Sequence, residues 1–225
     1  MSVSALSAST QNYLKAIWSL GEWSDEPVTT STVAARVGVR MSTASDAIRK
    51  LHELGLVDHT KYGSMTLTDD GRAHALAMVR RHRLIETFLV EVLGYRWDQV
   101  HEEADSLEHA VSDFMVERIA EHLGHPERDP HGDPIPRQDG SILELDAVTL
   151  TDLGTGRRAL VERIADDDPA LLQFFADQEI GVGSLLEVRP GAPYSGGVQV
   201  TVDGFDDVLT LGRAATDAIW VKPAR

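Results

Sequence analysis

Six residues whose side chains can bind a cation lie at spacings that an α-helix would align. They are His82 and Glu86, four residues apart, and His101, Asp105, Glu108 and His109, at intervals of four, three and one. Residues three or four apart share one face of a helix, so each set can converge on one point. Imidazole nitrogens and carboxylate oxygens held a turn apart suit a divalent cation, which neutralises charges that are costly to bring together.

The donor types narrow the choice of metal. The chain has no cysteine, so the ligands are nitrogen and oxygen only. Such a set favours Mn(II) or Fe(II) over Cu(I) or a structural zinc, although zinc would rank higher by affinity alone. Acidic helix faces with a few histidines are usually solvated surface, and this alternative stays open for any single residue. For the joint pattern we favour a metal site, because a solvated helix has no need of histidine near a carboxylate twice over.

Length and composition describe an ordinary globular protein. The 225 residues suffice for two or three small domains, and 42% of them are hydrophobic and 25% charged. The first residues lack a basic region followed by an apolar core, and no later run is long enough to span a bilayer. We therefore expect a cytoplasmic protein with no membrane partner. The lack of cysteine agrees with a reducing compartment and excludes disulfides and thiol catalysis.

The formal net charge of −15 argues at first sight against binding to nucleic acid. The acidic excess is uneven, however. Residues 1–75 carry 7 Lys and Arg against 8 Asp and Glu, whereas residues 76–140 and 141–225 each carry 7 against 14. From Arg36 to Lys50 there are four basic residues and one acidic residue. A small basic surface on a nearly neutral module can still bind phosphates.

The N-terminal third has the outline of a winged helix-turn-helix. A first amphipathic helix runs from a cap at Ser9 or Thr10 to residue 20, and a second covers residues 30–37 and ends at Gly38. A third helix is capped by Ser42 or Thr43 and ends at residue 55, and a hairpin pairs residues 56–59 with 65–68 around a turn at 61–64. The third helix has a buried stripe of Ala47, Ile48, Leu51 and Leu54.

The third helix is expected to enter the major groove of DNA. Its outward side chains near the N-terminal end are polar or charged and can reach base edges or phosphates, and further basic residues and the wing could contact the backbone. The candidate DNA-binding residues are Arg40, Ser42, Thr43, Ser45, Asp46, Arg49, Lys50, Lys61 and Tyr62. A helix-turn-helix outline can also serve protein contacts, so this alternative stays open.

A long helix is predicted from Asp69, with a break at Gly94 and a new start at Asp98. Its apolar residues predict a buried helix pair, most simply a twofold one, because DNA readers of this kind commonly pair to read two half-sites. These residues are Leu84, Ile85, Phe88, Leu89, Val92 and Leu93. The proline-rich stretch from residue 124 to 140 is interpreted as a loop and linker, with surface histidines at 122, 125 and 131.

In the last third of the chain the hydrophobic pattern changes from helical spacing to the short runs typical of strands. Short β-rich runs separated by glycines predict five or six strands, including one over residues 148–153, and Pro169–Asp177 has helical spacing. This pattern indicates a small β-barrel with one helical insert.

Taken together, these motifs resemble the diphtheria toxin repressor family of metal-dependent transcriptional regulators. The stretches RRHRLIETFL, WDQVHEEADSLEHAVSD and DPHGDPIP carry the resemblance, which covers nearly the whole chain. The implied fold class is mainly α with α+β. The implied domains are a winged helix-turn-helix over residues 1–74, a helical metal-binding and dimerisation domain over 75–140, and an SH3-like (FeoA-like) β-barrel over 148–225.

The resemblance also implies two metal sites. The ancillary site would use His82, Glu86 and His101, with a further oxygen from Asp166 in the barrel. The primary site would use Asp105, Glu108 and His109, together with Asn12 from the first helix. Iron-responsive members carry Cys at the position of Asp105 and Met at that of Asn12, whereas manganese-responsive members carry carboxylates. Asp105 therefore favours the manganese-responsive branch, while Asn12 supplies an oxygen without a charge.

The implied function is a repressor that binds operator double-stranded DNA as a homodimer when loaded with Mn(II). An Fe(II)-responsive regulator is the alternative within the family, and Co(II), Ni(II), Zn(II) or Cd(II) would substitute in vitro. Metal would join the first helix to the second domain through Asn12. It would thereby fix the orientation in which the two DNA-binding domains of a dimer meet the double helix.

Two alternatives come from other functional classes. A carboxylate and histidine metal hydrolase could use the same ligands, but the second domain offers no Gly-rich phosphate loop and no nucleophile motif. An interaction protein whose barrel recruits a partner would leave the helix-turn-helix unexplained. We therefore expect no enzymatic activity and no small-molecule substrate.

Overall fold

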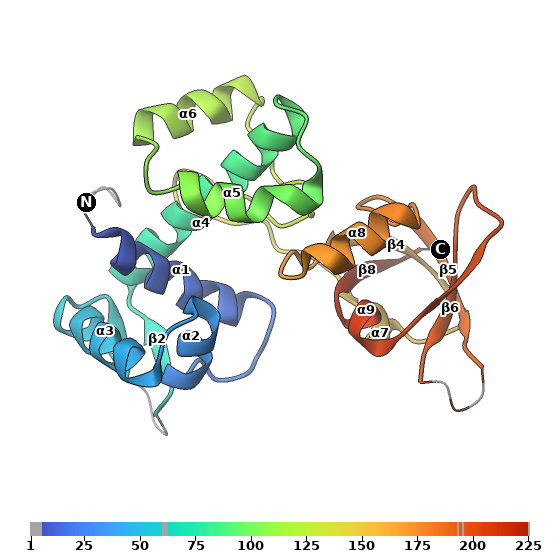
Figure 1. The fold of residues 1–225 in the computed structure, drawn as a ribbon, viewed down its shortest axis with the longest axis horizontal. Coiled ribbons are helices and arrows are strands. Elements are labelled where there is room, and N and C mark those ends of the chain that lie inside the picture. The colour runs from blue at the N-terminus through green and yellow to red at the C-terminus, as the bar shows by residue number, and fades with distance from the viewer. Residues whose placement is uncertain (1–5, 60–62, 193, 195, 225) are drawn as a thin grey trace. The chain divides into compact units, whose positions relative to one another are not determined.

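The computed structural model describes residues 6–59, 63–192, 194 and 196–224. The helices are α1 (Ala8–Glu22), α2 (Thr30–Val37), α3 (Met41–Glu53), α4 (Asp69–Glu91), the 3-10 helix η3 (Trp97–Gln99), α5 (Val100–Leu107), α6 (Asp113–His122), α7 (Leu150–Leu153), α8 (Pro169–Asp177) and α9 (Arg213–Asp217). The strands are β1 (Val57–His59), β2 (Met65–Leu67), β3 (Val148–Thr149), β4 (Arg157–Ile164), β5 (Leu185–Pro190), β6 (Val198–Val202), β7 (Val208–Leu211) and β8 (Ile219–Ala224) (Figure 1).

Contacts divide the chain into two compact units. The first comprises Met1–Ile85, Asp105–Gly124 and Pro136–Ile142, and the second comprises Glu86–Ala104, His125–Ile135 and Leu143–Arg225. Helices α4 and α5 each contribute to both units. Among the described residues, no helix is long and apolar enough to cross a membrane.

The N-terminal module packs α1, α2 and α3 against the short antiparallel hairpin β1–β2, in which Val57 pairs with Leu67 (Figure 1). The apolar stripes of the helices meet in a common core that includes Leu14, Val33 and Ile48. This arrangement confirms the predicted winged helix-turn-helix. The wing residues Lys61 and Tyr62 lie outside the described residues.

The helix caps correct one detail of the sequence analysis and confirm another. Helix α1 begins earlier than predicted, because the Ser7 hydroxyl accepts the Thr10 N–H at 3.3 Å, so a cap at Ser9 or Thr10 is wrong. The predicted end of α2 is confirmed, because Gly38 adopts the left-handed conformation, with φ +71°, that glycine tolerates best. Thr29 and Thr32 form a reciprocal capping box at its start.

The start of α3 also differs from prediction, whereas its end is confirmed. Arg40 is the N-cap and makes no side-chain cap bond, so Ser42 and Thr43 do not cap the helix but lie exposed in its first turn. The last helical residue is Glu53, and Gly55 stops the chain in the predicted left-handed conformation, with φ +70°. Leu54 was expected in the buried stripe but is 52% exposed. The buried residues of the helix are Ala44, Ile48 and Leu51.

Helix α4 starts at Asp69 as predicted, and the chain reverses at Gly94, which has φ +73°. Helix α6, capped by Ser112, was not predicted. The apolar residues at the C-terminal end of α4 were expected to form a twofold contact between two chains. Leu84, Ile85 and Leu89, however, are already buried within one chain. Other apolar residues, Val92 and Leu93, remain exposed.

The proline-rich stretch is packed rather than a linker. Residues 131–136 are buried, and Ile164 of β4 donates its N–H to the His131 carbonyl at 2.9 Å. A Cβ on Gly132 would lie 2.2 Å from the Glu162 carbonyl oxygen, so only glycine fits this close approach. The prediction of a surface His131 is therefore wrong, whereas His122 and His125 are exposed as predicted.

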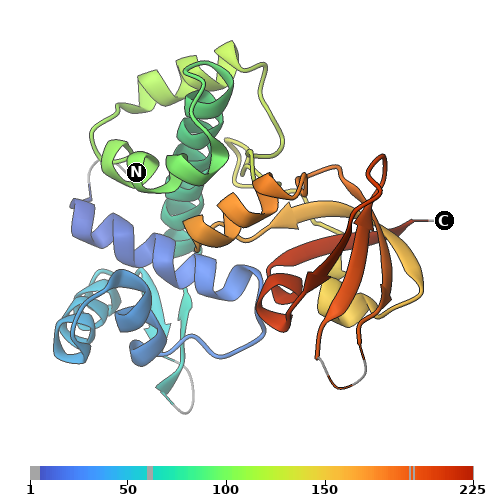
Figure 2. The same cartoon turned by 45° about the vertical axis from the view of Figure 1, so that its right-hand side comes forward.

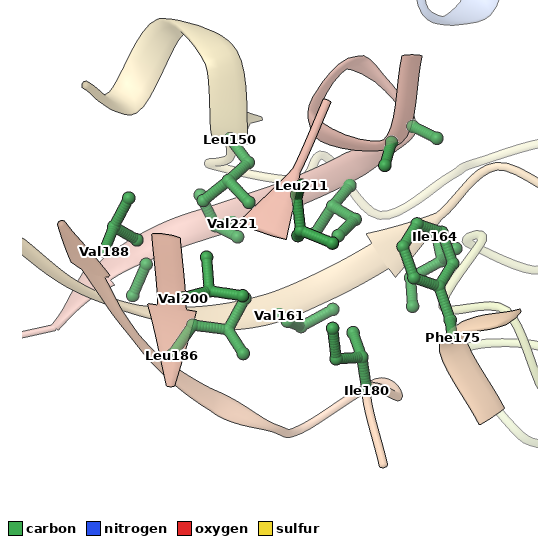
Figure 3. Packing of buried hydrophobic residues seen from close by; sticks show 14 of the residues in the cluster. Leu150, Val161, Ile164, Phe175, Ile180, Leu186, Val188, Val200, Leu211 and Val221 are labelled. Atoms are coloured by element: carbon green, nitrogen blue, oxygen red, sulfur yellow. The ribbon is translucent and has the colours of Figure 1, made fainter. Parts of the chain in front are cut away.

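The C-terminal third is a six-stranded antiparallel sheet in the order β3-β8-β4-β5-β6-β7, curled as a small barrel (Figure 2). Its inward side chains, including Val161, Phe175, Leu186 and Val200, form one apolar core (Figure 3). The barrel and α8 are confirmed. The strand expected over residues 148–153 is mostly α7, because Thr149 caps a helix there, and α9 was not predicted.

A β-bulge interrupts the pairing of β4 with β8. Val161 pairs with Val221 and Arg163 with Trp220, so two steps along β4 match one step along β8, and Glu162 is the extra residue. Beyond the bulge both Arg163 and Ile164 are buried.

Candidate metal centre and nucleic-acid interface

The first cluster of predicted ligands lies within the first unit. On α4, His82 Nδ1 is 2.7 Å from Glu108 Oε2 and 3.3 Å from Asp105 Oδ1. Asp105 lies on α5 and Glu108 follows directly after it, so the three-residue spacing brings both carboxylates to one side of the chain. The sequence assigned His82 to the other set, but here its Nδ1 faces these two carboxylates.

The N-terminal helix completes this cluster from the opposite side. His109 Nε2 lies 2.6 Å from Asn12 Oδ1 and 3.5 Å from Glu108 Oε1. His109 Nδ1 lies 2.7 Å from Gln11 Oε1. If Nδ1 carries the proton and donates to Gln11, Nε2 presents the lone pair that a metal requires. Asn12 and His109 are thus brought together across 97 residues of sequence.

Lys15 is a member of this cluster that the sequence analysis missed. Its Nζ lies 2.7 Å from Asp105 Oδ1, 2.8 Å from Glu108 Oε2 and 3.2 Å from His82 Nδ1. Burial alone would lower the pKa of Lys15, but the charges of Glu108 and Asp105 outweigh it and raise the pKa above its usual value. Lys15 follows Asn12 by three residues and so shares its helix face, but this spacing points to the cluster only once Asn12 is known to contact His109.

Glu108 is the most enclosed carboxylate of the cluster, with no measurable exposure. Burial would raise its pKa, but the hydrogen bond from His82 and the charge on Lys15 lower the pKa below its usual value. Its Oε1 is buried and accepts no hydrogen bond from the described part of the chain. A buried carboxylate oxygen without a donor is costly, and a cation would satisfy it.

These donors fit a hard divalent cation. The set offers oxygens from Asn12, Asp105 and Glu108 and nitrogen from His109, without sulfur. Such a set suits Mn(II), Fe(II) or Zn(II) rather than Cu(I). The unsatisfied Glu108 Oε1 faces the His109 nitrogen, where a metal would share both atoms.

A second cluster lies in the second unit. His101 Nδ1 is 3.3 Å from Glu86 Oε1 and 3.1 Å from Asp166 Oδ2, which brings together three of the four residues expected at the ancillary site. The fourth, His82, precedes Glu86 by one turn of α4. Burial would lower the pKa of His101, but its hydrogen bonds to Asp166 and Glu86 raise the pKa to about 11.

The raised pKa of His101 predicts proton release on metal binding. Below pH 11 the metal-free imidazole is protonated, and it must lose that proton to coordinate a metal. We expect one proton to be released at this site near pH 7, and affinity to rise about tenfold per pH unit. Calorimetry in buffers of different ionisation enthalpy counts the protons. A His101→Gln variant that releases as many protons as the parent chain would contradict this.

A third group, Glu86, Asp129 and His131, is also buried in the second unit, and its potential ligand atoms lie within 4.8 Å of one another. His131 Nε2 donates to the Trp97 carbonyl at 2.8 Å, and its ring stacks on the Trp97 ring. The sequence analysis missed this group because it interpreted the proline-rich stretch as exposed.

The candidate DNA-binding residues on α3 and its cap are all exposed. They are Arg40, Ser42, Thr43, Ser45, Asp46, Arg49 and Lys50. Arg49 is held by Asp46 at 2.9 Å and by Glu53 at 4.0 Å, so its guanidinium is already oriented on the outer face of the helix. This face can meet a phosphate backbone or base edges.

Comparison with known proteins agrees with this arrangement. Three family models match in succession: "Iron dependent repressor, N-terminal DNA binding domain" at residues 5–65, "Iron dependent repressor, metal binding and dimerisation domain" at 68–137, and "FeoA domain" at 148–223. The iron-dependent repressor IdeR of Mycobacterium leprae is 30% identical over 226 residues, which cover 95% of this chain and 96% of that protein. The chain belongs to the diphtheria toxin repressor family.

Other members of the family agree. The diphtheria toxin repressor of Corynebacterium diphtheriae is 34% identical over 189 residues, covering 80% of this chain and 83% of that protein. A solved structure described as "Manganese-dependent transcriptional repressor complex with manganese" is 51% identical, with a TM-score of 0.91 and coverage of 96% of this chain and 100% of that one. Another, "Crystal Structure of ScaR with bound Zn2+", is 30% identical, with a TM-score of 0.81 and coverage of 95% and 98%.

The family assignment confirms the main functional prediction. The chain is a metal-dependent transcriptional repressor, and the alternative of a carboxylate and histidine hydrolase is not supported, because the family consists of repressors rather than enzymes. The similarity to manganese-dependent repressors supports the manganese-responsive branch, and the iron-responsive alternative is not better supported.

Proposed function

We propose that the chain is an Mn(II)-dependent repressor that binds operator DNA as a homodimer in the cytoplasm. The observation that carries this proposal is the convergence of Asn12 from α1 with His109 and Glu108. A dication bound there would tie the helix that supports the DNA-reading module to the α4–α5 region. Metal would then stabilise the arrangement that fits DNA.

We assign two metal sites to this function. The primary site uses Asn12, Asp105, Glu108 and His109, with His82 Nδ1 beside Glu108. The proposed ancillary site uses Glu86, His101 and Asp166, together with His82, which precedes Glu86 by one turn of α4. When bound, the metal supplies positive charge and directional coordination, and the residues of the chain hold their orientations by the hydrogen bonds described above.

Manganese is favoured over iron by the ligands and by the comparisons. Oxygen donors from Asp105 and Asn12 suit Mn(II), which competes poorly at softer sites. The manganese-bound neighbour at 51% identity supports the same assignment. Fe(II) remains the alternative, and Co(II), Ni(II), Zn(II) and Cd(II) are proposed as substitutes in vitro.

A homodimer is proposed because a DNA reader of this type matches two half-sites by twofold symmetry. Phe114 and Met115 are adjacent at the start of α6 and are 76% and 47% exposed, so together they place apolar surface in solvent there. The matched family model is described as a dimerisation domain and includes both residues. We propose that a second copy covers them.

The direct test is binding to an operator fragment selected from the source genome, measured with Mn(II), with Fe(II) and with chelator. We expect tight binding with Mn(II) and weak, salt-sensitive binding with chelator, because a ligand shifts an equilibrium only by its differential affinity for the two states. Equal affinity under all three conditions would exclude metal-dependent repression by this route.

The assignment of α3 as the DNA-reading helix predicts how salt will act. Replacing Lys50 with alanine removes one exposed cation and should weaken binding to every sequence, lowering the slope of log affinity against log salt by about 1. The matched control is Lys222→Ala, which removes an exposed lysine of β8 in the other unit. A Lys50→Ala variant with the slope of the control would show that α3 does not lie on the phosphates.

A further inference from the structure

Lys15 places a positive charge among the residues assigned to the primary metal site. Its ammonium group lies within 2.8 Å of oxygens from both Asp105 and Glu108 and 3.2 Å from His82 Nδ1. A divalent metal bound to both carboxylates would need the same space and the same lone pairs. An ammonium group and a dication cannot occupy that position together, because like charges a few ångströms apart repel strongly where water is scarce.

The enclosure makes this contact strong. The Lys15 side chain is 18% exposed and that of Glu108 is 1% exposed, so water screens the pair poorly. The Lys15 ammonium group can also move away from the carboxylates into solvent, because its four-carbon stem is flexible and the side chain is partly exposed. Asn12, one turn earlier on α1, contacts His109 at 2.6 Å, and this contact does not involve the Lys15 ammonium group.

We propose that Lys15 is an intramolecular competitor of the metal: its ammonium group neutralises Asp105 and Glu108 in the metal-free chain, and metal binding expels it. This inference rests on the proposed function and adds a regulatory element to the primary site. Lys15 raises the metal concentration at which the repressor loads. Lys15 also connects α1 to Glu108 in the metal-free chain. Metal binding would therefore replace an attachment of α1 through Lys15 by one through the metal and Asn12.

The size of the effect follows from competition. If the ammonium group fills the site for nine-tenths of the time, the apparent metal affinity is reduced about tenfold. Removing the charge should therefore tighten binding by about that factor. It should also destabilise the metal-free chain, because two carboxylates would then face each other without a counter-charge.

The first experiment measures expulsion directly in the unaltered chain. An amine-reactive acetylating reagent is applied with chelator or with Mn(II), and modification of each lysine is read by peptide mass spectrometry. We expect Lys15 to react several-fold faster with Mn(II), since its amine moves from the carboxylates to solvent. Lys50, which is exposed on α3, is the internal control and should not change. A Lys15 that is equally or less reactive with Mn(II) would overturn the proposal.

The second experiment compares Mn(II) dissociation constants, followed by the electron paramagnetic resonance signal of free Mn(II). Lys15→Met keeps an apolar stem without the charge and should bind about tenfold tighter, whereas Lys15→Arg should bind no tighter than the parent chain. Unchanged or weaker binding by Lys15→Met would overturn the competition. If Mn(II) still promotes operator binding in that case, the proposed function stands. Failure of Mn(II) to bind a chain with intact Asp105 and Glu108 would instead remove the proposed function.

Discussion

Replacing Glu108 with glutamine is expected to abolish metal-dependent operator binding. Glu108 is fully buried, and its carboxylate contacts Lys15, His82 and His109. Glutamine keeps the shape but loses the negative charge that a dication requires. Loss of outer contacts alone typically lowers metal affinity 10- to 100-fold, so loss of a direct ligand should lower it by more than about 100-fold.

The same substitution should destabilise the metal-free chain by about 3 kcal/mol, because Lys15 would lose its best enclosed partner while remaining charged. Chemical denaturation gives the free energy of unfolding, and Mn(II) titration with an operator mobility shift gives the functional loss. Glu117→Gln is the matched control, since Glu117 pairs with Arg80 at 3.3 Å on α6 and is assigned no metal role. A Glu108→Gln chain that still binds the operator in response to Mn(II) would disprove the assignment of this ligand.

Replacing Arg163 with methionine is expected to destabilise the second unit by about 3–5 kcal/mol. Arg163 donates from Nε to Asp133 at 2.7 Å, and both side chains are at least 95% buried. Methionine fills the stem but leaves the Asp133 carboxylate enclosed without its cation. The substitution also removes the stacking of the guanidinium over the Trp220 ring, at 4.3 Å from its centroid.

Tryptophan fluorescence during denaturation measures this loss, because Trp220 belongs to the same unit. Arg158→Met is the control: Arg158 lies on the same strand and pairs with Asp203 at 2.9 Å, but both side chains are at least half exposed. Exposed pairs contribute roughly 0–1 kcal/mol, so the control should unfold close to the parent chain. Equal losses in the two variants would show that burial of the Arg163 pair is not what stabilises this region.

The parts of the fold that could be predicted are those set by local pattern. The stripe of Ile48 and Leu51 and the left-handed glycines Gly38 and Gly55 define the helix-turn-helix without knowledge of tertiary contacts. Helix α6 escaped prediction because it buries only Val116, Ile119 and Ala120, and the apolar residues just before them, Phe114 and Met115, are exposed and lie off that face.

The candidate metal site shows which residues could not be predicted from local sequence pattern. The histidines and carboxylates of α4 and α5 could be found from spacing, because their own helices align them. Lys15 could not, since a lysine on an amphipathic helix is usually solvated, and its contact with Asp105 spans 90 residues of sequence. His131 was misjudged for a related reason: prolines indicate an irregular backbone, but burial depends on whether another segment covers it.

The bulge in β4 decides which face of the barrel Arg163 occupies. Glu162 is the extra residue, so Val161 and Arg163 pair with adjacent residues of β8 while both side chains are buried. Deleting Glu162 would let the strand pair without interruption, with Ile164 still opposite Ile219, so the hydrogen bonds of the sheet could re-form. Because neighbouring side chains of a regular strand point to opposite faces, Arg163 would then follow Val161 on the solvent side. A chain shortened in this way could keep its barrel and yet leave Asp133 enclosed without its cation, although neither residue of that ion pair had been replaced.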